Sequence, residues 1–203
     1  MALAYQPAND ALGYEERQLV KRCQAGDRRA FDEIICRYQK KVINLAYHIL
    51  GNYTEALDLA QDTFIKVYVS IKKYRGQASF YTWVYRITVN LCKNKLKYRK
   101  RRGYYKKRSL DEPLELKEGS LKLDLPADSP GPREALAEKE KRETIRQAID
   151  FLEESHRMVL ILRDREMFSY EEIAAVLKCE IGTVKSRLHR ARQMLKEKLE
   201  GIL

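Results

Sequence analysis

The chain has 203 residues, of which 44% are hydrophobic and 34% are charged, so it can build one or two folded domains beneath a densely charged surface. Lys and Arg total 40 against 29 Asp and Glu, and the resulting formal charge of +11 favours a polyanionic partner such as nucleic acid or an anionic membrane surface. The nine glycines are too widely spaced for a P-loop or a G-x-G-x-x-G motif, which excludes the commonest phosphate-binding loops.

Apolar residues at steps of three and four predict a series of helices in the first half of the chain. The expected helices lie near residues 15–25, 31–49, 56–71 and 80–91. Gly51 should end the second of these, and Thr54 and Ser79 are candidate N-caps of the third and fourth. Together they predict a helical N-terminal domain over residues 1–109.

A long basic block runs through the second half of this predicted domain. Residues 63–110 contain 15 Lys and Arg and no acidic residue, together with closely spaced aromatic residues. Proteins bind single strands by stacking bases on aromatic rings and holding phosphates with basic side chains, so the block suits single-stranded or opened DNA. Phe64 and Trp83 lie on the apolar stripes and are expected in the core more than against a base. Tyr74 and Tyr81 lie off the stripe, so we expect them to be free to meet a base.

Residues 110–132 lose the helical periodicity and contain four of the five prolines of the chain, which predicts a flexible linker. Between Asp111 and Pro130 there are six acidic residues and two basic ones. An acidic segment of this kind is either a solvated tether or the occupant of a basic nucleic-acid channel on a partner. The residues alone leave both interpretations open.

Helical periodicity resumes near residue 133, which predicts a second helical domain over residues 133–203. Ser169 and Glu172 have the spacing of a capping box at the start of a short helix. After a brief break a final helix begins at Ile181, and its free face carries Lys185, Ser186, His189 and Arg190. Two such helices, the second basic on its free face, are typical of a helix-turn-helix. The sequence therefore predicts an all-α protein of two small helical domains joined by a flexible linker.

Several kinds of anchor and site are not expected. The longest stretch without a charged side chain, Val42–Thr54, is shorter than the roughly 18–20 residues of a membrane-spanning helix. Met1–Tyr14 lacks the basic start and apolar run of a signal peptide, so we expect a cytoplasmic protein without direct membrane insertion. The four cysteines form no close pair and the three histidines add no ligand-like spacing, so no disulfide, metal site or cofactor is expected.

Four motifs follow one another in an order and spacing typical of one family. They are Asp58–Phe64, Tyr74–Trp83 with Arg86–Asn90, Ser169–Ala174 and Gly182–Arg192. With these motifs the chain resembles the extracytoplasmic-function group of bacterial RNA polymerase sigma factors. The resemblance spans both predicted domains and is far more specific than a helix-turn-helix alone. It implies a factor without catalytic activity of its own that gives core RNA polymerase its promoter specificity, with a linker that threads the RNA path of the polymerase.

The resemblance also implies three functional surfaces. The clamp of the largest polymerase subunit is expected to bind Asp58, Gln61 and Asp62. An extruded non-template base of the minus-ten promoter element, and the DNA beside it, are expected to meet Tyr74, Arg75, Gln77, Ser79, Phe80, Tyr81, Trp83, Arg86, Asn90, Lys93 and Asn94. The major groove of the minus-thirty-five element is expected to meet Thr183, Lys185, Ser186, Arg187, His189 and Arg190. An anti-sigma factor is a further expected partner, whereas a small-molecule substrate is not expected.

Two other functions compete with this hypothesis. A self-contained helix-turn-helix regulator would explain Ser169–Arg192, but neither the aromatic and basic block nor the Asp58–Phe64 motif. A nucleic-acid enzyme would need a metal or phosphate site, and neither the basic block nor the histidines and cysteines supply one. Binding to core RNA polymerase would distinguish a sigma factor from a regulator.

Overall fold

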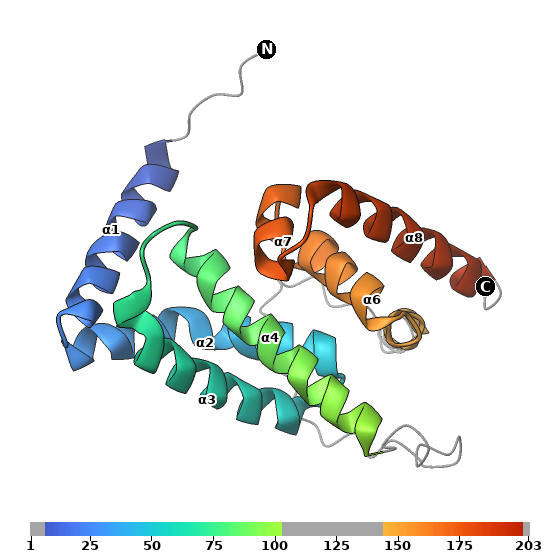
Figure 1. Ribbon diagram of the computed structural model, residues 1–203, viewed down its shortest axis with the longest axis horizontal. Helices are drawn as coiled ribbons and strands as arrows, with labels where there is room; N and C mark the ends of the chain where they lie inside the picture. The colour runs from blue at the N-terminus through green and yellow to red at the C-terminus, as the bar shows by residue number, and fades with distance from the viewer. Residues whose placement is uncertain (1–6, 103–143, 201–203) are drawn as a thin grey trace, which may run out of the picture.

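The computed structural model describes residues 7–102 and 144–200, and every element in those ranges is helical (Figure 1). The N-terminal part contains α1 (Pro7–Gln24), α2 (Arg28–Leu50), α3 (Tyr53–Ser70), the 3₁₀ turn η1 (Ile71–Lys73) and α4 (Phe80–Arg101). The C-terminal part contains a helical segment over 144–150, α6 (Glu154–Leu160), the π-helical turn η3 (Ile161–Arg165), α7 (Tyr170–Leu177) and α8 (Ile181–Glu200). The all-α prediction is confirmed over these residues. The expected linker at 110–132 lies outside them, and the expected domain limits stay predictions.

Local capping sets the helix boundaries in the N-terminal part. Gly51 ends α2, as predicted, in the left-handed conformation (φ 70°) that glycine adopts at little cost. Ser79 caps α4, also as predicted. The prediction of Thr54 as the cap of α3 is wrong. The side chain of Asn52 accepts a hydrogen bond from the backbone N–H of Glu55 at 3.0 Å, so the helix already begins at Tyr53.

α2, α3 and α4 pack against one another, and α1 packs against α2 and η1 (Figure 1). The side chains buried in this N-terminal core include Ile34, Tyr38, Val42, Phe64, Val67, Phe80 and Val84. Burying one large apolar side chain contributes about 1.5–3 kcal/mol, so this shared core holds the four helices together.

A second core joins the N-terminal and C-terminal parts. It combines buried residues of α2, α3 and α4 with residues of α6, η3, α7 and α8. The ring of Phe168, only 1% exposed, lies 5.1 Å from Tyr81 and 5.0 Å from Tyr85 of α4, measured between ring centroids. The Tyr85 hydroxyl donates a hydrogen bond to Glu166 at 2.7 Å. α4 therefore belongs to both cores and lies against α7 (Figure 1).

Two arginines meet the carbonyl end of α2. The buried Arg99 donates to the carbonyl oxygen of Leu50 at 2.8 Å and pairs with Glu55. From the C-terminal part, Arg157 donates to the carbonyl oxygen of Ile49 at 3.5 Å. The helix dipole favours cations at this end. The C-terminus of α2 therefore binds one arginine from each part of the chain and helps to hold the C-terminal part against the N-terminal part.

The predicted capping box at the start of α7 is confirmed. The hydroxyl of Ser169 accepts from the N–H of Glu172 at 3.1 Å, and the Glu172 carboxylate accepts from the N–H of Ser169 at 2.8 Å. Lys178, the residue after α7, adopts the left-handed conformation and caps the helix, and α8 begins at Ile181. These two helices form the expected helix-turn-helix.

Candidate nucleic-acid interface

A row of polar side chains runs along one face of α3. Asp58, Gln61 and Asp62 are all exposed and stand at steps of three and four, so they share that face. Ile65, one turn further along, is 62% exposed. The three residues expected to bind the polymerase are therefore accessible, beside an apolar side chain of the kind that protein interfaces bury.

The segment between η1 and α4 is a loop that α1 holds in place. The side-chain amide of Gln24 donates to the carbonyl oxygens of Ile71 and Tyr74, both at 2.9 Å. Within the loop, the Tyr74 hydroxyl donates to the carbonyl oxygen of Ala78 at 2.6 Å, and Gly76 supplies a left-handed turn (φ 72°). The loop is thus ordered before a ligand arrives, which lowers the entropic cost of binding.

A cavity of about 570 Å³ lies between this loop and α1, within the roughly 300–1,000 Å³ range of small-ligand sites. The loop side is lined by Tyr74, Arg75, Gly76, Ala78, Ser79 and Phe80. The α1 side is lined by Gly13, Glu16, Arg17, Val20, Lys21 and Gln24. Burial raises the pKa of Tyr74 and of Glu16, and the nearby Arg37 and Lys41 oppose that rise at Glu16.

The residues expected at the minus-ten element differ in accessibility. Those that are exposed are Arg75, Gln77, Ser79, Asn90 and Asn94, and those that are partly buried are Tyr74, Tyr81, Trp83, Arg86 and Lys93. Phe64 is buried, as expected. Phe80 is only 2% exposed, because its ring packs edge-on against Tyr38 and Tyr74 at 5.7 and 5.4 Å between centroids. Phe80 therefore lines the cavity from the core side, and its contact with DNA stays a prediction.

Tyr81 is not free to meet a base in this structure, and that expectation is corrected. Its ring stacks on Phe168 and lies 4.2 Å from the ring of Tyr85, measured between centroids. Burial raises the pKa of the Tyr81 hydroxyl to about 12. Helical periodicity could not reveal this contact, because Phe168 belongs to the other side of the predicted linker.

Lys93 and Arg187 were expected on two different promoter elements, yet they line one cavity of about 250 Å³ together with Glu154. Burial lowers the pKa of Lys93, and the neighbouring Glu154 opposes that effect. The DNA-binding surfaces expected in the two parts of the chain therefore approach each other in this structure.

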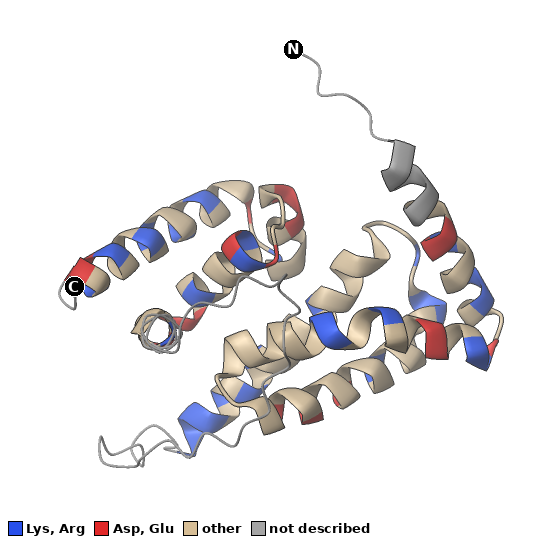
Figure 2. Ribbon diagram, turned by 180° about the vertical axis from the view of Figure 1, so that it is seen from behind, with Lys and Arg blue, Asp and Glu red and all other residues tan. Residues whose placement is uncertain are grey.

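α8 presents the basic face that its sequence predicted. Val184, Leu188 and Ala191 are buried, whereas Lys185, Ser186, His189 and Arg190 are exposed. Thr183 and Arg187 are partly buried. Figure 2 shows Lys and Arg spaced along this helix. The exposed row is accessible to the groove of a DNA duplex.

Sequence reasoning missed the α1 wall of the larger cavity. Glu16, Arg17 and Lys21 carry no motif, and the only signal in this region was the amphipathic pattern of a helix. Their position beside the loop depends on a contact between residues 50 positions apart, the Gln24 to Tyr74 hydrogen bond.

All four cysteines are free. Within residues 7–102 and 144–200, no group of three or more His, Cys, Asp or Glu side chains is arranged to hold a metal ion. No helix in the described part of the chain is long and apolar enough to cross a membrane.

Two family models match the chain. The model of Sigma-70 region 2 matches residues 34–102, which hold most of α2, all of α3 and α4, and the loop between them. The model of Sigma-70 region 4 matches residues 142–195, which include the helix-turn-helix.

Relatives of known identity cover nearly the whole chain. The RNA polymerase sigma-H factor of Pseudomonas aeruginosa is 40% identical over 189 residues, which are 93% of this chain and 96% of the relative. The ECF RNA polymerase sigma-E factor of Escherichia coli K12 is 35% identical over 188 residues, with the same two shares.

Solved structures share the fold. The sigma factor RpoE, in complex with the anti-sigma factor NepR from Bartonella quintana, has a TM-score of 0.61 and 25% identity, covering 84% of this chain and 96% of that one. CnrH in complex with the cytosolic domain of CnrY has a TM-score of 0.65 and 21% identity, covering 92% and 97%, a likeness that concerns the fold alone.

Proposed function

The chain belongs to the extracytoplasmic-function group of RNA polymerase sigma factors, and we propose that its surfaces divide the work of promoter-specific initiation among three sites. It binds core RNA polymerase, directs it to promoter DNA and opens that DNA. The proposal depends mainly on one observation: the same chain has an exposed basic face on α8 and an ordered loop at 74–80 that lines a cavity. A self-contained regulator would have no use for the loop and the cavity.

The polymerase site is the exposed face of α3. Asp58, Gln61 and Asp62 contact the clamp of the largest polymerase subunit, and their charges favour encounter with a complementary surface. Ile65 supplies an apolar anchor beside them, the type of contact that contributes most to interface energy when it is buried.

The minus-ten site is the loop between η1 and α4. Extruding a base costs a few kcal/mol, and stacking on an aromatic ring offsets about 1–3 kcal/mol of that cost. Tyr74 and Phe80 are the aromatic residues that line the cavity, Tyr74 is the less buried of the two and stacks on the base, and Arg75 lies beside it as a phosphate ligand. Further along α4, Arg86, Asn90 and Asn94 hold the adjacent DNA.

The minus-thirty-five site is α8, which enters the major groove of duplex DNA. Lys185, Ser186, His189 and Arg190 form one exposed row, as a recognition helix requires. Long basic side chains of this kind bind guanine edges or phosphates, and which of the two they bind decides whether they read sequence.

The proposed partners extend to an anti-sigma factor, which the complex of RpoE with NepR supports. The protein acts with its polymerase in the cytoplasm and has no catalytic turnover of its own. The linker at 110–132 passes along the RNA path of the polymerase.

Run-off transcription tests the function. The purified chain, core polymerase and a pool of genomic promoter fragments should yield discrete transcripts only when the first two are both present. The double change Asp58→Ala and Asp62→Ala should abolish co-elution with core polymerase and transcription together, while Asp32→Ala at an exposed position of α2 is the matched control. Sequence-specific DNA binding without co-elution over a range of salt would favour the self-contained regulator instead.

A further inference from the structure

The cavity at the 74–80 loop has a second wall, and α1 supplies it. Half of the lining residues come from α1. They all precede residue 34, at which the Sigma-70 region 2 match begins. A ligand that the loop captures would therefore also contact a helix that the family match leaves without a role.

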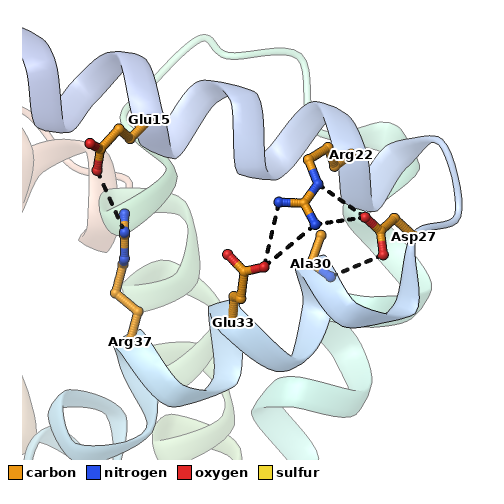
Figure 3. A network of polar contacts seen from close by, with 6 residues as sticks. All are labelled: Glu15, Arg22, Asp27, Ala30, Glu33 and Arg37. Atoms are coloured by element: carbon orange, nitrogen blue, oxygen red, sulfur yellow. Dashed lines mark hydrogen bonds and ion pairs between the residues drawn. The ribbon is translucent and has the colours of Figure 1, made fainter.

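Polar contacts fix α1 on α2 (Figure 3). Arg22 pairs with Asp27 at 2.8 Å and with Glu33 at 3.4 Å, and Arg37 of α2 lies 4.0 Å from Glu15. Exposed ion pairs are each worth only about 0–1 kcal/mol, so the buried apolar face of α1 supplies most of the stability. The pairs instead favour one position of α1 on α2, in which Glu16, Arg17 and Lys21 line the cavity.

Glu16 is the hydrogen-bond acceptor of the α1 wall. Its carboxylate accepts from the Tyr38 hydroxyl. An ionised carboxylate has about four acceptor positions, so one bond leaves capacity for a ligand in the cavity. Acidic side chains recognise the exocyclic amine of a base, as with N4 of cytosine. Thymine presents a carbonyl oxygen at that position, which a carboxylate would repel.

The basic residues that line the cavity suit a phosphate. Arg17 and Lys21 are exposed, stand four residues apart on α1 and so share a face. Arg75 lines the facing wall, on the loop. Basic side chains on both walls, together with Tyr74 on the loop wall, match the phosphate and the base of one nucleotide.

We propose that this cavity is a nucleotide pocket in which α1 reads the base. Glu16 accepts a hydrogen bond from the exocyclic amine of an extruded cytosine or adenine, and Arg17 and Lys21 hold the neighbouring phosphate. Gln24 is a positioning residue, because it fastens the loop to this wall. The inference rests on the role in promoter opening proposed above for the loop.

The test of base selection uses holoenzyme assembled with the full chain. Scanning 2-aminopurine through the non-template strand first locates the extruded position by its fluorescence. Short strands that differ only there should then bind roughly tenfold more tightly with cytosine or adenine than with thymine. Glu16→Gln introduces an amide that both donates and accepts, so it should reduce this preference to about twofold. Asp32→Asn, the same change of acid to amide away from the cavity, should leave the preference intact.

The phosphate contacts are tested on the same strands. Arg17→Ala and Lys21→Ala should each weaken all the strands equally, by roughly 3- to 10-fold, and lower the slope of log affinity against log salt concentration. Arg28→Ala, an exposed cation at the start of α2, is the control. Co-elution with core polymerase verifies that each variant is folded.

Two outcomes are distinguishable. If wild-type holoenzyme initiates normally while Glu16→Gln keeps its full preference and both cation variants bind like Arg28→Ala, the α1 pocket is overturned and the proposed function stands. If wild-type holoenzyme fails to initiate, the proposed function itself is overturned.

Discussion

His48 lies where the two parts of the molecule meet. Its Nε2 atom is 3.0 Å from the guanidinium nitrogen Nη1 of Arg165 on η3. Burial, and then the charge of Arg165, lower the pKa of His48 to about 4. A neutral ring can accept a hydrogen bond from the guanidinium, whereas a protonated ring would repel it.

Acid should therefore destabilise the folded chain through His48. Between pH 6.5 and about 4 the unfolded chain binds a proton that the folded chain does not, so the free energy of unfolding falls as the pH is lowered, by up to about 3 kcal/mol. Glu166, whose pKa burial raises, acts in the opposite direction, so the comparison must be made between variants. Urea unfolding of His48→Gln should show a flatter pH profile than wild type. His189→Gln, at an exposed position, is the control, and a profile of His48→Gln that parallels wild type would contradict the assignment.

In α8 the buried residues and the exposed basic residues lie on separate faces of the helix. Its buried residues are part of the C-terminal core, whereas the exposed basic row is not part of that core. Substitutions in that row can therefore change DNA binding without a large change in stability.

Replacing Lys185 or Arg190 with Ala should lower transcription that depends on the minus-thirty-five element. The expected loss is about 1–3 kcal/mol if the side chain contacts a base edge, and it should then vary with the base at one position of the element. Transcription from a set of promoters with single substitutions measures this. Lys196→Ala, on the same helix and paired with Glu200 at 3.5 Å, is the matched control. An equal loss on every promoter would assign the residue to phosphates.

Helix boundaries were predictable where the signal is local. The Ser169 and Glu172 capping box, the Ser79 cap and the Gly51 stop each depend on residues within four positions of one another, and all three predictions are confirmed. Thr54 was the wrong choice because Asn52, a residue type preferred over Thr at N-caps, lies two residues earlier and caps the helix instead.

At the scale of the whole molecule, α4 is the element that joins the two parts. Tyr85 and Tyr81 on α4 enclose the ring of Phe168, and Tyr85 also donates to Glu166. Met167, which lies between Glu166 and Phe168 in the chain, is 76% exposed and has a positive φ of 56°. A non-glycine residue in that region is strained, so the contact holds the chain in a turn that it would not otherwise prefer.

Phe168→Ala should loosen the junction between the two parts. Truncating a buried phenylalanine costs about 3–5 kcal/mol, and here the lost contacts lie between α4 and the C-terminal part. The radius of gyration of the free chain, measured by small-angle X-ray scattering, should rise while helicity by circular dichroism is retained. Met167→Gly, which removes the neighbouring exposed side chain and relieves its φ, should leave the radius unchanged. An unchanged radius in Phe168→Ala would show that other contacts suffice.

Site residues that belong to local sequence motifs could be predicted from the sequence. Site residues that depend on contacts between distant segments could not. The exposed rows on α3 and α8 follow from helical periodicity around buried neighbours such as Leu59 and Leu188. The α1 wall and the contact of Tyr81 with Phe168 depend instead on which distant segments pack together. No short-range pattern encodes those contacts, so periodicity alone wrongly predicted a free Tyr81.

Lys93 and Arg187 share one small cavity, although the elements they are expected to bind are, by their names, about 25 base pairs apart, or about 85 Å along B-form DNA. With the promoter contacts proposed above for Lys93 and Arg187, one chain in this shape cannot hold both elements at once. The apparent dissociation constant for an intact promoter is therefore the intrinsic constant divided by the fraction of chains in which the two parts have separated. A separation free energy of about 2.7 kcal/mol would weaken binding by about 100-fold. On this proposal, a polymerase that holds the parts at promoter spacing removes the penalty, and we expect DNA recognition to become effective only after the enzyme is bound.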